Sequence, residues 1–273
     1  MFVHVPVKYA TPPLEHAEEV ALTSVDYWMQ ASDDGAAVTP LMRCPEFEQR
    51  LLRPKAGEEE RSDHARDEVL FVLDGAGRAT IGGEAHDLAP GNAVFVARGT
   101  AWRLDEADGL RILSVLVEDP LPSSATHAVI GTGERGVATA GRAFDLFAHP
   151  GSGCASVTQF VGHIPPGRAP DHFHLYDEVG YILSGEGAFH WLEASSAEPP
   201  TPGRKATPPS AAGGDESAPL RPGSCFHLPA RLVHSLENFG PGEMHVLGVF
   251  RPAGSPAEAY YPDGTAAAVP AAY

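Results

Sequence analysis

An internal repeat constrains the fold of this chain more than any other feature of its sequence. The segment DEVLFVLDGAGRA, which starts at Asp67, returns as DEVGYILSGEGAF from Asp177, 110 residues later. Self-similarity at a fixed offset indicates a duplicated structural unit. A chain of 273 residues is long enough to build two separate cores. We therefore predict two similar domains in tandem.

The segments around both copies are typical of β-strands. Short runs rich in Val, Ile, Leu and Phe, such as VLFVLDGAG, LRILSVLVE and MHVLGVF, are bounded by Gly, Pro or Asp-Gly turns. Helical periodicity is limited to PPLEHAEEVAL and to a piece near SPAEAYY. Many short strands with turns between them predict an all-β protein made of two antiparallel barrels.

The predicted division of the chain follows from composition and from the spacing of the repeat. Gly91 and Gly223 occupy the same place in the two copies but lie 132 residues apart instead of 110, so about 22 residues were added in the second copy. Residues 193–220 are crowded with Pro, Ala, Ser and Gly and predict a flexible insertion there. We predict an N-terminal extension (1–40), a first barrel (41–125), a linker (126–142), a second barrel (143–252) and a C-terminal tail (253–273).

Charge and hydropathy exclude several classes of partner. The chain has 36 acidic and 19 basic residues, and its net charge of -17 repels nucleic-acid phosphates and anionic lipids. No segment reaches the apolar length that spans a bilayer, and the N-terminus lacks the features of a secretory signal. We therefore expect a cytoplasmic protein without nucleic-acid or membrane partners. Cys44, Cys154 and Cys225 have no CxxC spacing and predict neither a disulfide framework nor a zinc knuckle.

The segment PDHFHLYDEVGYILSGEG, residues 170–187, carries a candidate metal site. Because side chains alternate along a strand, His172, His174 and Glu178 are expected on one face. Imidazole nitrogen and carboxylate oxygen suit divalent ions such as Fe, Mn, Ni, Co or Zn. A fourth ligand has to come from another strand that faces the same cavity, and His234 in RPGSCFHLPARLVHSLEN is the candidate.

These two segments resemble the paired motifs of the cupin superfamily, HxHxxxExxxxxxG and GxxxxxPxGxxHxxxN. The first motif is matched by His172, His174, Glu178 and Gly185, and the second by Gly223, Pro229, His234 and Asn238. Arg231 stands where the family usually has a turn glycine, and a residue with a side chain is disfavoured at positive φ. The resemblance implies a two-barrel (bicupin) jelly-roll protein with one divalent metal ion, Fe or Mn favoured over Ni, Co or Zn, bound by His172, His174, Glu178 and His234.

The first copy resembles the same motifs in degenerate form. His64 and Glu68 match two ligand positions, whereas Ser62 and Trp102 stand where the other two histidines would be. A site reduced to two ligands binds divalent metals poorly, so we predict a metal-free first barrel that contributes to packing. In the alternative, Trp102 creates an apolar binding site in which His64 and Glu68 hydrogen-bond a ligand.

Several functions are compatible with such a site. We favour a non-haem metal oxygenase that acts on a small, oxygen-rich organic molecule. The alternatives are a redox-neutral isomerase, lyase or aminohydrolase in which the metal is a Lewis acid, and a small-molecule-binding protein without catalysis. His227, on the strand leading to Pro229, and Glu178 are the candidate proton carriers, and Arg168 is a candidate attractor of an anionic substrate. Face-to-face packing of barrel sheets would also allow a homodimer.

Strand alternation also predicts the walls of the cavity. Ile182 shares parity with Glu178 and should face inward, whereas Tyr181 should face outward. His190 and Trp191 are neighbours on the following strand, so one of the two should point inward.

Overall fold

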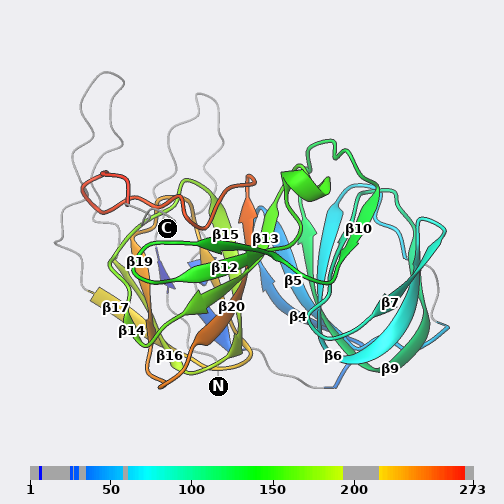
Figure 1. Cartoon of the computed structure of the whole chain (residues 1–273), viewed down its shortest axis with the longest axis horizontal. Coiled ribbons are helices and arrows are strands. Elements are labelled where there is room, and N and C mark those ends of the chain that lie inside the picture. Colours follow the sequence, from blue (N-terminus) through cyan, green and yellow to red (C-terminus); the bar gives the residue numbers. More distant parts are fainter. Residues whose placement is uncertain are drawn as a thin grey trace.

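The computed structural model describes residues 6–7, 25–26, 28–30, 35–57, 61–192 and 215–267, which form two β-barrels side by side (Figure 1). Their paired strands are antiparallel, and a short 3-10 turn, η1 (Pro150–Ser152), is the only helical element among these residues. The predicted all-β fold is therefore confirmed. Within the described ranges we find no helix with the length and apolar character needed to cross a bilayer.

The first barrel is built on two long strands that pair along most of their length. The pairing of β6 (Asp67–Ile81) with β9 (Trp102–Val117) is interrupted by bulges, which bend both strands. The sheet order is β10-β8-β6-β9-β5-β4, with β7 paired to β6. The remaining strands are β4 (Val38–Arg43), β5 (Phe47–Leu52), β7 (Glu84–Leu88), β8 (Ala93–Val96) and β10 (His127–Ile130).

The second barrel consists of two sheets. One has the order β11-β12-β13-β20-β15-β18-β3 and the other β14-β19-β16-β17. Its strands are β3 (Trp28–Gln30), β11 (Glu134–Val137), β12 (Ala143–Leu146), β13 (Thr158–Ile164), β14 (Gly167–Arg168), β15 (Asp177–Ser184), β16 (Gly187–Leu192), β17 (Asp215–Leu220), β18 (Ser224–Leu228), β19 (His234–Asn238) and β20 (Met244–Arg251). A separate pair, β1 (Pro6–Val7) and β2 (Val25–Asp26), completes the described strands.

The two repeat copies occupy equivalent places, β6 in the first barrel and β15 in the second. Glu68 pairs with Val96, and Glu178 pairs with Leu228, which keeps the offsets of 110 and 132 residues seen in the sequence. The next residues along each strand, Val69 and Val179, point toward the opposite barrel. The duplication therefore extends to strand register.

A hydrophobic core joins the barrels and explains why the repeated strands are so uniformly apolar. Val69, Phe71, Val179 and Tyr181 contribute to a buried cluster drawn from both barrels. Ile182 lies instead in the core of the second barrel, as strand alternation predicts. A strand with one face in its own barrel and the other against a second barrel has no solvent face, so its hydrophobic run is continuous.

The predicted linker, residues 126–142, contains the point where the chain crosses between the barrels, but it also contains strands. β10 pairs with β8 and therefore belongs to the sheet of the first barrel, whereas β11 pairs with β12 of the second. The chain passes from one barrel to the other within residues 131–133. Small residues such as Gly, Thr and Ala suit short edge strands as well as linkers, so composition alone does not separate the two.

In three other predicted segments, some residues belong to the folded barrels. In the predicted N-terminal extension, β3 pairs with β18 of the second barrel and β4 begins at Val38. In the predicted insertion 193–220, residues 215–220 form β17 against β16, while 193–214 lie outside the described residues. The predicted tail is docked over 253–267: Tyr260 exchanges backbone hydrogen bonds with Phe173, and no helix forms near SPAEAYY. The other helix expected from sequence, PPLEHAEEVAL, lies outside the described residues.

Candidate metal centre

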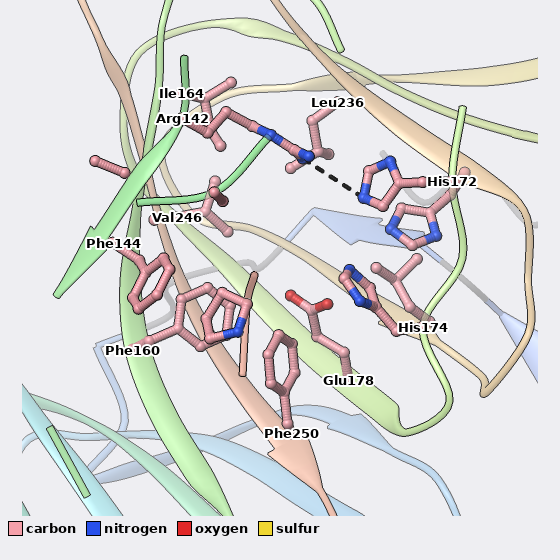
Figure 2. A pocket seen from close by; sticks show the side chains of 16 residues that line it. Arg142, Phe144, Phe160, Ile164, His172, His174, Glu178, Leu236, Val246 and Phe250 are labelled. Carbon is pink, nitrogen blue, oxygen red and sulfur yellow. Dashed lines mark hydrogen bonds between the residues drawn. The ribbon is translucent and has the colours of Figure 1, made fainter. Parts of the chain in front are cut away.

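A cavity of about 50 Å³ lies within the second barrel (Figure 2). One side carries the three histidines and Glu178, and the opposite wall is mainly apolar. The lining residues are Ala138, Arg142, Ala143, Phe144, Phe160, Gly162, Ile164, His172, His174, Glu178, Leu228, His234, Leu236, Val246, Phe250 and Pro256. The cavity therefore combines a polar cluster with a small apolar chamber.

Backbone pairing brings three histidines together. His172 and His234 exchange backbone hydrogen bonds of 3.0 and 2.8 Å across an antiparallel bridge, and His174 follows two residues along the same face. One ring nitrogen from each of the three lies within 4.8 Å of the others. This spacing suits a shared metal ion after small side-chain adjustments.

The hydrogen bonds of these three rings fix their tautomers. In each ring, Nδ1 faces a backbone carbonyl oxygen: 2.8 Å for His172 and Pro170, 2.7 Å for His174 and Glu258, and 2.9 Å for His234 and Leu232. Because a carbonyl oxygen only accepts, Nδ1 carries the hydrogen and Nε2 keeps its lone pair. Such carbonyl partners orient metal-binding histidines and raise their basicity toward the metal.

The electrostatics keep the three rings neutral. Burial is the largest cause that lowers the pKa of His172 well below its usual value, of His174 to about 3 and of His234 to about 4. Neighbouring positive charge, including that of Arg142, acts in the same direction. Metal ions compete with protons for imidazole, so neutral rings near pH 7 favour binding.

Glu178 lies in the same cavity but outside the tight cluster of the three histidines. Figure 2 shows its carboxyl group pointing into the cavity beside His174. Gly248 leaves room for it, because a Cβ at that position would lie 3.0 Å from Oε1 of Glu178. Burial raises the pKa of Glu178 to about 8, against the opposing charges of Arg142 and His227. The group can therefore hold or release a proton near neutral pH.

Arg142 is the residue of this cavity that sequence reasoning missed. It directly precedes β12, and its side chain lines the cavity beside His172. Nε donates to the carbonyl of Thr139 at 3.1 Å and Nη2 to Oγ1 of Thr139 at 2.8 Å, while Nη1 lies 3.5 Å from Nε2 of His172. Arg142 falls in the predicted linker, where no strand pattern assigns it a face. Its proximity to the metal motif depends on tertiary packing.

The structure moves His227 away from the cavity and so corrects its predicted place as a proton carrier there. Phe226 and Leu228, its neighbours on β18, pack inside the second barrel. His227 therefore faces the first barrel. Its Nε2 lies 3.4 Å from Oδ1 of Asp177, which begins β15 of the second barrel. The prediction placed it by its distance from Pro229 along the strand, without considering strand parity.

In the first barrel, two of the residues at the motif positions, Glu68 and Trp102, bind each other. Trp102 donates its indole hydrogen to Oε2 of Glu68 at 3.2 Å, and Oε1 of Glu68 accepts from Arg50 at 2.9 Å and Ser114 at 2.5 Å. His64 is exposed. Glu68 thus has donors on both oxygens, an arrangement that favours a structural role over the alternative ligand site with His64.

The structure also places four further residues that the sequence analysis singled out around the second barrel. Trp191 packs inward, and His190 points outward to Glu237, 2.9 Å away. Arg168 lies near the surface, where it pairs with Asp171 at 3.0 Å and does not line the cavity. Arg231 adopts a φ of 71°, the left-handed value that the motif's glycine position requires.

Comparisons with known proteins agree with this architecture. Residues 50–117, within the first barrel, match the model of the cupin domain, and no curated protein sequence matches the chain. A variant of oxalate decarboxylase from Bacillus subtilis is 13% identical, with 85% of this chain and 79% of that chain covered and a TM-score of 0.63. AerE from Microcystis aeruginosa is 15% identical, with 81% and 95% covered and a TM-score of 0.58. At these identities the likeness shows the fold, and with the domain match it supports the cupin superfamily.

Proposed function

We propose that this protein is a metal-dependent enzyme that acts on a small carboxylate-bearing molecule in the second barrel. The observation that carries the proposal is Arg142, a guanidinium in the same cavity as three neutral histidines and Glu178. None of the ion pairs of the described residues involves Arg142. Because a buried charge is costly without a counter-charge, an anionic substrate is the natural partner.

The donor set fits a divalent ion. His172, His174 and His234 would supply Nε2 lone pairs, and Glu178 is the nearby carboxylate that could complete the site. Imidazole and carboxylate without thiolate suit Mn or Fe, and Ni, Co or Zn are also compatible. A similar solved structure of oxalate decarboxylase is described as containing Mn(II) centres, which favours Mn here. When bound, the ion would supply Lewis acidity and, for Fe or Mn, redox activity.

The dimensions of the cavity restrict the substrate. About 50 Å³ is several times the roughly 10–15 Å³ that a cavity needs to hold one water molecule, so a molecule of a few non-hydrogen atoms fits without rearrangement. Phe160 and Phe250 form part of the apolar wall and would exclude water from a bound carboxylate. A small mono- or dicarboxylate bound by Arg142 satisfies both the charge and the size of the cavity.

Glu178 would carry the proton that such a reaction moves. Its carboxyl group points into the cavity beside His174, and in the metal-free protein burial raises its pKa to about 8, so it is the cavity's carboxyl group that can exchange a proton with a substrate carbon or oxygen. Proton transfer of this kind suits redox-neutral chemistry, such as loss of carbon dioxide from a carboxylate, isomerisation or elimination. A titratable carboxyl group in the same cavity as Arg142 is the reason to place this class first.

An oxygenase is the second candidate. Three neutral histidines leave further coordination positions of an octahedral ion open, and non-haem iron oxygenases bind dioxygen at such open positions. The two candidates differ in one requirement. A redox-neutral enzyme turns over without oxygen consumption, whereas an oxygenase needs dioxygen in stoichiometric amounts.

The proposal is tested with full-length protein reconstituted with Mn²⁺ or Fe²⁺ and a panel of small mono-, di- and keto-acids. Calorimetry measures binding, and an oxygen electrode with product NMR, run with and without air, separates the reaction classes. Arg142→Gln should weaken carboxylate binding by about 10- to 100-fold, the usual value of hydrogen bonds to a charged group. Arg168→Gln, the surface control, should leave affinity unchanged.

Glu178→Gln then separates catalysis from binding. We expect this variant to bind the carboxylate while turnover is lost, because glutamine cannot donate the proton. Carboxylate binding that survives Arg142→Gln would overturn the substrate proposal. Binding without turnover in every condition would show a binding protein instead of an enzyme.

A further inference from the structure

A second group of metal-ligating side chains lies where the two barrels meet. Cys44 and Glu46 belong to the turn between β4 and β5 of the first barrel, and His227 belongs to β18 of the second. The cysteine sulfur, a carboxylate oxygen of Glu46 and a ring nitrogen of His227 all lie within 4.8 Å of one another. Oδ1 of Asp177 lies 3.4 Å from Nε2 of His227.

His227 lacks the hydrogen bonds that a buried imidazole normally makes. It is 3% exposed, and neither ring nitrogen makes a hydrogen bond of normal geometry, although Nε2 has a longer ionic contact of 3.4 Å with Oδ1 of Asp177. Buried imidazoles nearly always make hydrogen bonds, so a ring that makes none of normal geometry while it faces a thiol and two carboxylates indicates a ligand at this place. This ring is separate from the cavity, because it projects from the opposite face of β18.

The duplication supplies an internal comparison for this cluster. Offsets of 110 and 132 residues relate Cys44 to Cys154, Asp177 to Asp67, Glu46 to Ser156 and His227 to Phe95. The second junction therefore keeps the cysteine and the aspartate but replaces the other two ligand types. Phe95 is fully buried in the core between the barrels, so the scaffold at this position accepts an apolar ring. The fold itself does not require the histidine and glutamate of the first junction.

We propose that Cys44, Glu46 and His227 bind a Zn²⁺-like divalent cation between the barrels, with the adjacent carboxylate of Asp177 as the fourth ligand. Zinc binds sulfur, nitrogen and oxygen ligands at about 2.0–2.3 Å in tetrahedral geometry. Ligand atoms are then about 3.4–3.8 Å apart, so the present cluster needs an inward shift of about 1 Å at most. The thiolate selects thiophilic ions, whereas the histidines and Glu178 of the cavity accept harder ones.

The expected consequence is a metal link between the two barrels. Two ligands come from a turn of the first barrel and the other two groups from strands of the second. An ion bound only by the folded protein raises the melting temperature, by an amount that grows with the logarithm of the free ion concentration once this exceeds the Kd. This junction site is therefore expected to hold the barrels in register, whatever reaction takes place in the cavity.

Cobalt(II) is the probe that distinguishes the two sites. Full-length, reduced, metal-free protein is titrated with Co²⁺, and the near-ultraviolet sulfur-to-cobalt charge-transfer absorption is recorded, since it requires a bound thiolate. Zn²⁺ is then added to displace the cobalt, and melting temperatures are measured with and without Zn²⁺. The variants are Cys44→Ser and His227→Phe at the junction, Cys154→Ser at its repeat counterpart, and a His172→Ala/His174→Ala/His234→Ala triple variant of the cavity.

The charge-transfer band and the Zn²⁺-dependent rise in melting temperature should appear in the wild type, in Cys154→Ser and in the cavity variant. Both should be lost in Cys44→Ser and His227→Phe. His227→Phe copies the side chain of the counterpart Phe95, so it is expected to fold even if Cys44→Ser does not. A wild type without the band, a band that survives both junction substitutions, or a band that needs the cavity histidines would overturn the proposal.

Discussion

Replacing Glu178 with glutamine tests the electrostatics of the cavity directly. In the metal-free protein, burial raises the pKa of this carboxyl from 4.5 to about 8. Between those pH values the folded protein keeps a proton that the unfolded chain has already released. The unfolded state then binds fewer protons, so the free energy of unfolding decreases as the pH rises through this window.

The size of the effect follows from the pKa. Each pKa unit is worth about 1.4 kcal/mol, so ionising Glu178 in the folded protein costs on the order of 5 kcal/mol. The free energy of unfolding consequently falls by on the order of 3 kcal/mol between about pH 5.5 and pH 8. Glutamine does not ionise, and Glu178→Gln therefore removes this loss. Glu178 is 6% exposed, so solvent screening removes little of the effect.

Urea unfolding of metal-free protein in the presence of EDTA measures this pH-dependent loss of stability. The wild type, Glu178→Gln and the exposed control Glu186→Gln are compared across the pH window. We expect the wild type and the control to lose stability in parallel, and Glu178→Gln to gain on both as the pH rises. If all three proteins give parallel curves, Glu178 ionises normally and the proton role proposed for it is refuted.

Three further changes give outcomes that stability measurements can check. Arg231→Gly should stabilise the fold by about 0.5–1 kcal/mol in urea unfolding, because Arg231 has a φ of 71° that glycine adopts without strain; a loss of stability would contradict this. Gly180→Ala should destabilise by about 1–3 kcal/mol, because a Cβ there would overlap the ring of Phe226, and an unchanged melting temperature would show that β18 can yield. Burial alone would lower the pKa of His227, but Asp177 and Cys44 raise it to about 9. In metal-free protein, the stabilisation that protonated His227 contributes to folding is therefore complete below about pH 6.5 and is lost as the pH rises through 9. His227→Phe should flatten the pH dependence of stability in that window, and an unaltered profile would argue against this ion pairing.

The sequence predicted the parts of this structure that depend on local pattern. The repeat starting at Asp67 and Asp177 gave the two barrels and the equivalence of β6 and β15, because strand register follows from a shared hydrophobic pattern and shared turns. Side-chain alternation likewise placed Ile182 inside and Tyr181 outside the second barrel. His172 and His174 share a face for the same reason, and the structure adds the backbone bridge to His234.

The features that sequence reasoning missed depend on contacts between distant segments. Arg142 reaches the cavity because the start of β12 packs over it, and no periodicity in a Gly-rich stretch reveals that. His227 faces Cys44 and Glu46 across the junction of the barrels, a neighbour relation between residues far apart in sequence. The edge strands β11 (ERGV) and β17 (DESAPL) were missed because small and polar residues form short strands only when a neighbour strand supplies the hydrogen bonds.

The repeat counterparts in the two barrels have different surroundings. Glu68 and Glu178 are repeat counterparts, yet Glu68 is bound by Arg50, Ser114 and Trp102 while Glu178 faces the cavity. Substituting Trp102 for a histidine ligand fills the first barrel with an apolar ring that packs in its core. The first barrel then stabilises the second by contributing one side of the core between them.

Manganese content tests whether His172, His174 and His234 form a metal centre. Wild-type protein, His174→Ala and its repeat counterpart His64→Ala are stripped with EDTA, loaded with Mn²⁺, passed through gel filtration and analysed for bound metal. Mn²⁺ prefers nitrogen and oxygen ligands, so the thiolate junction contributes little. We predict one manganese per chain in the wild type and in His64→Ala, and its loss in His174→Ala. Manganese retained by His174→Ala, or absent from the wild type, would show that these three histidines do not form the metal centre.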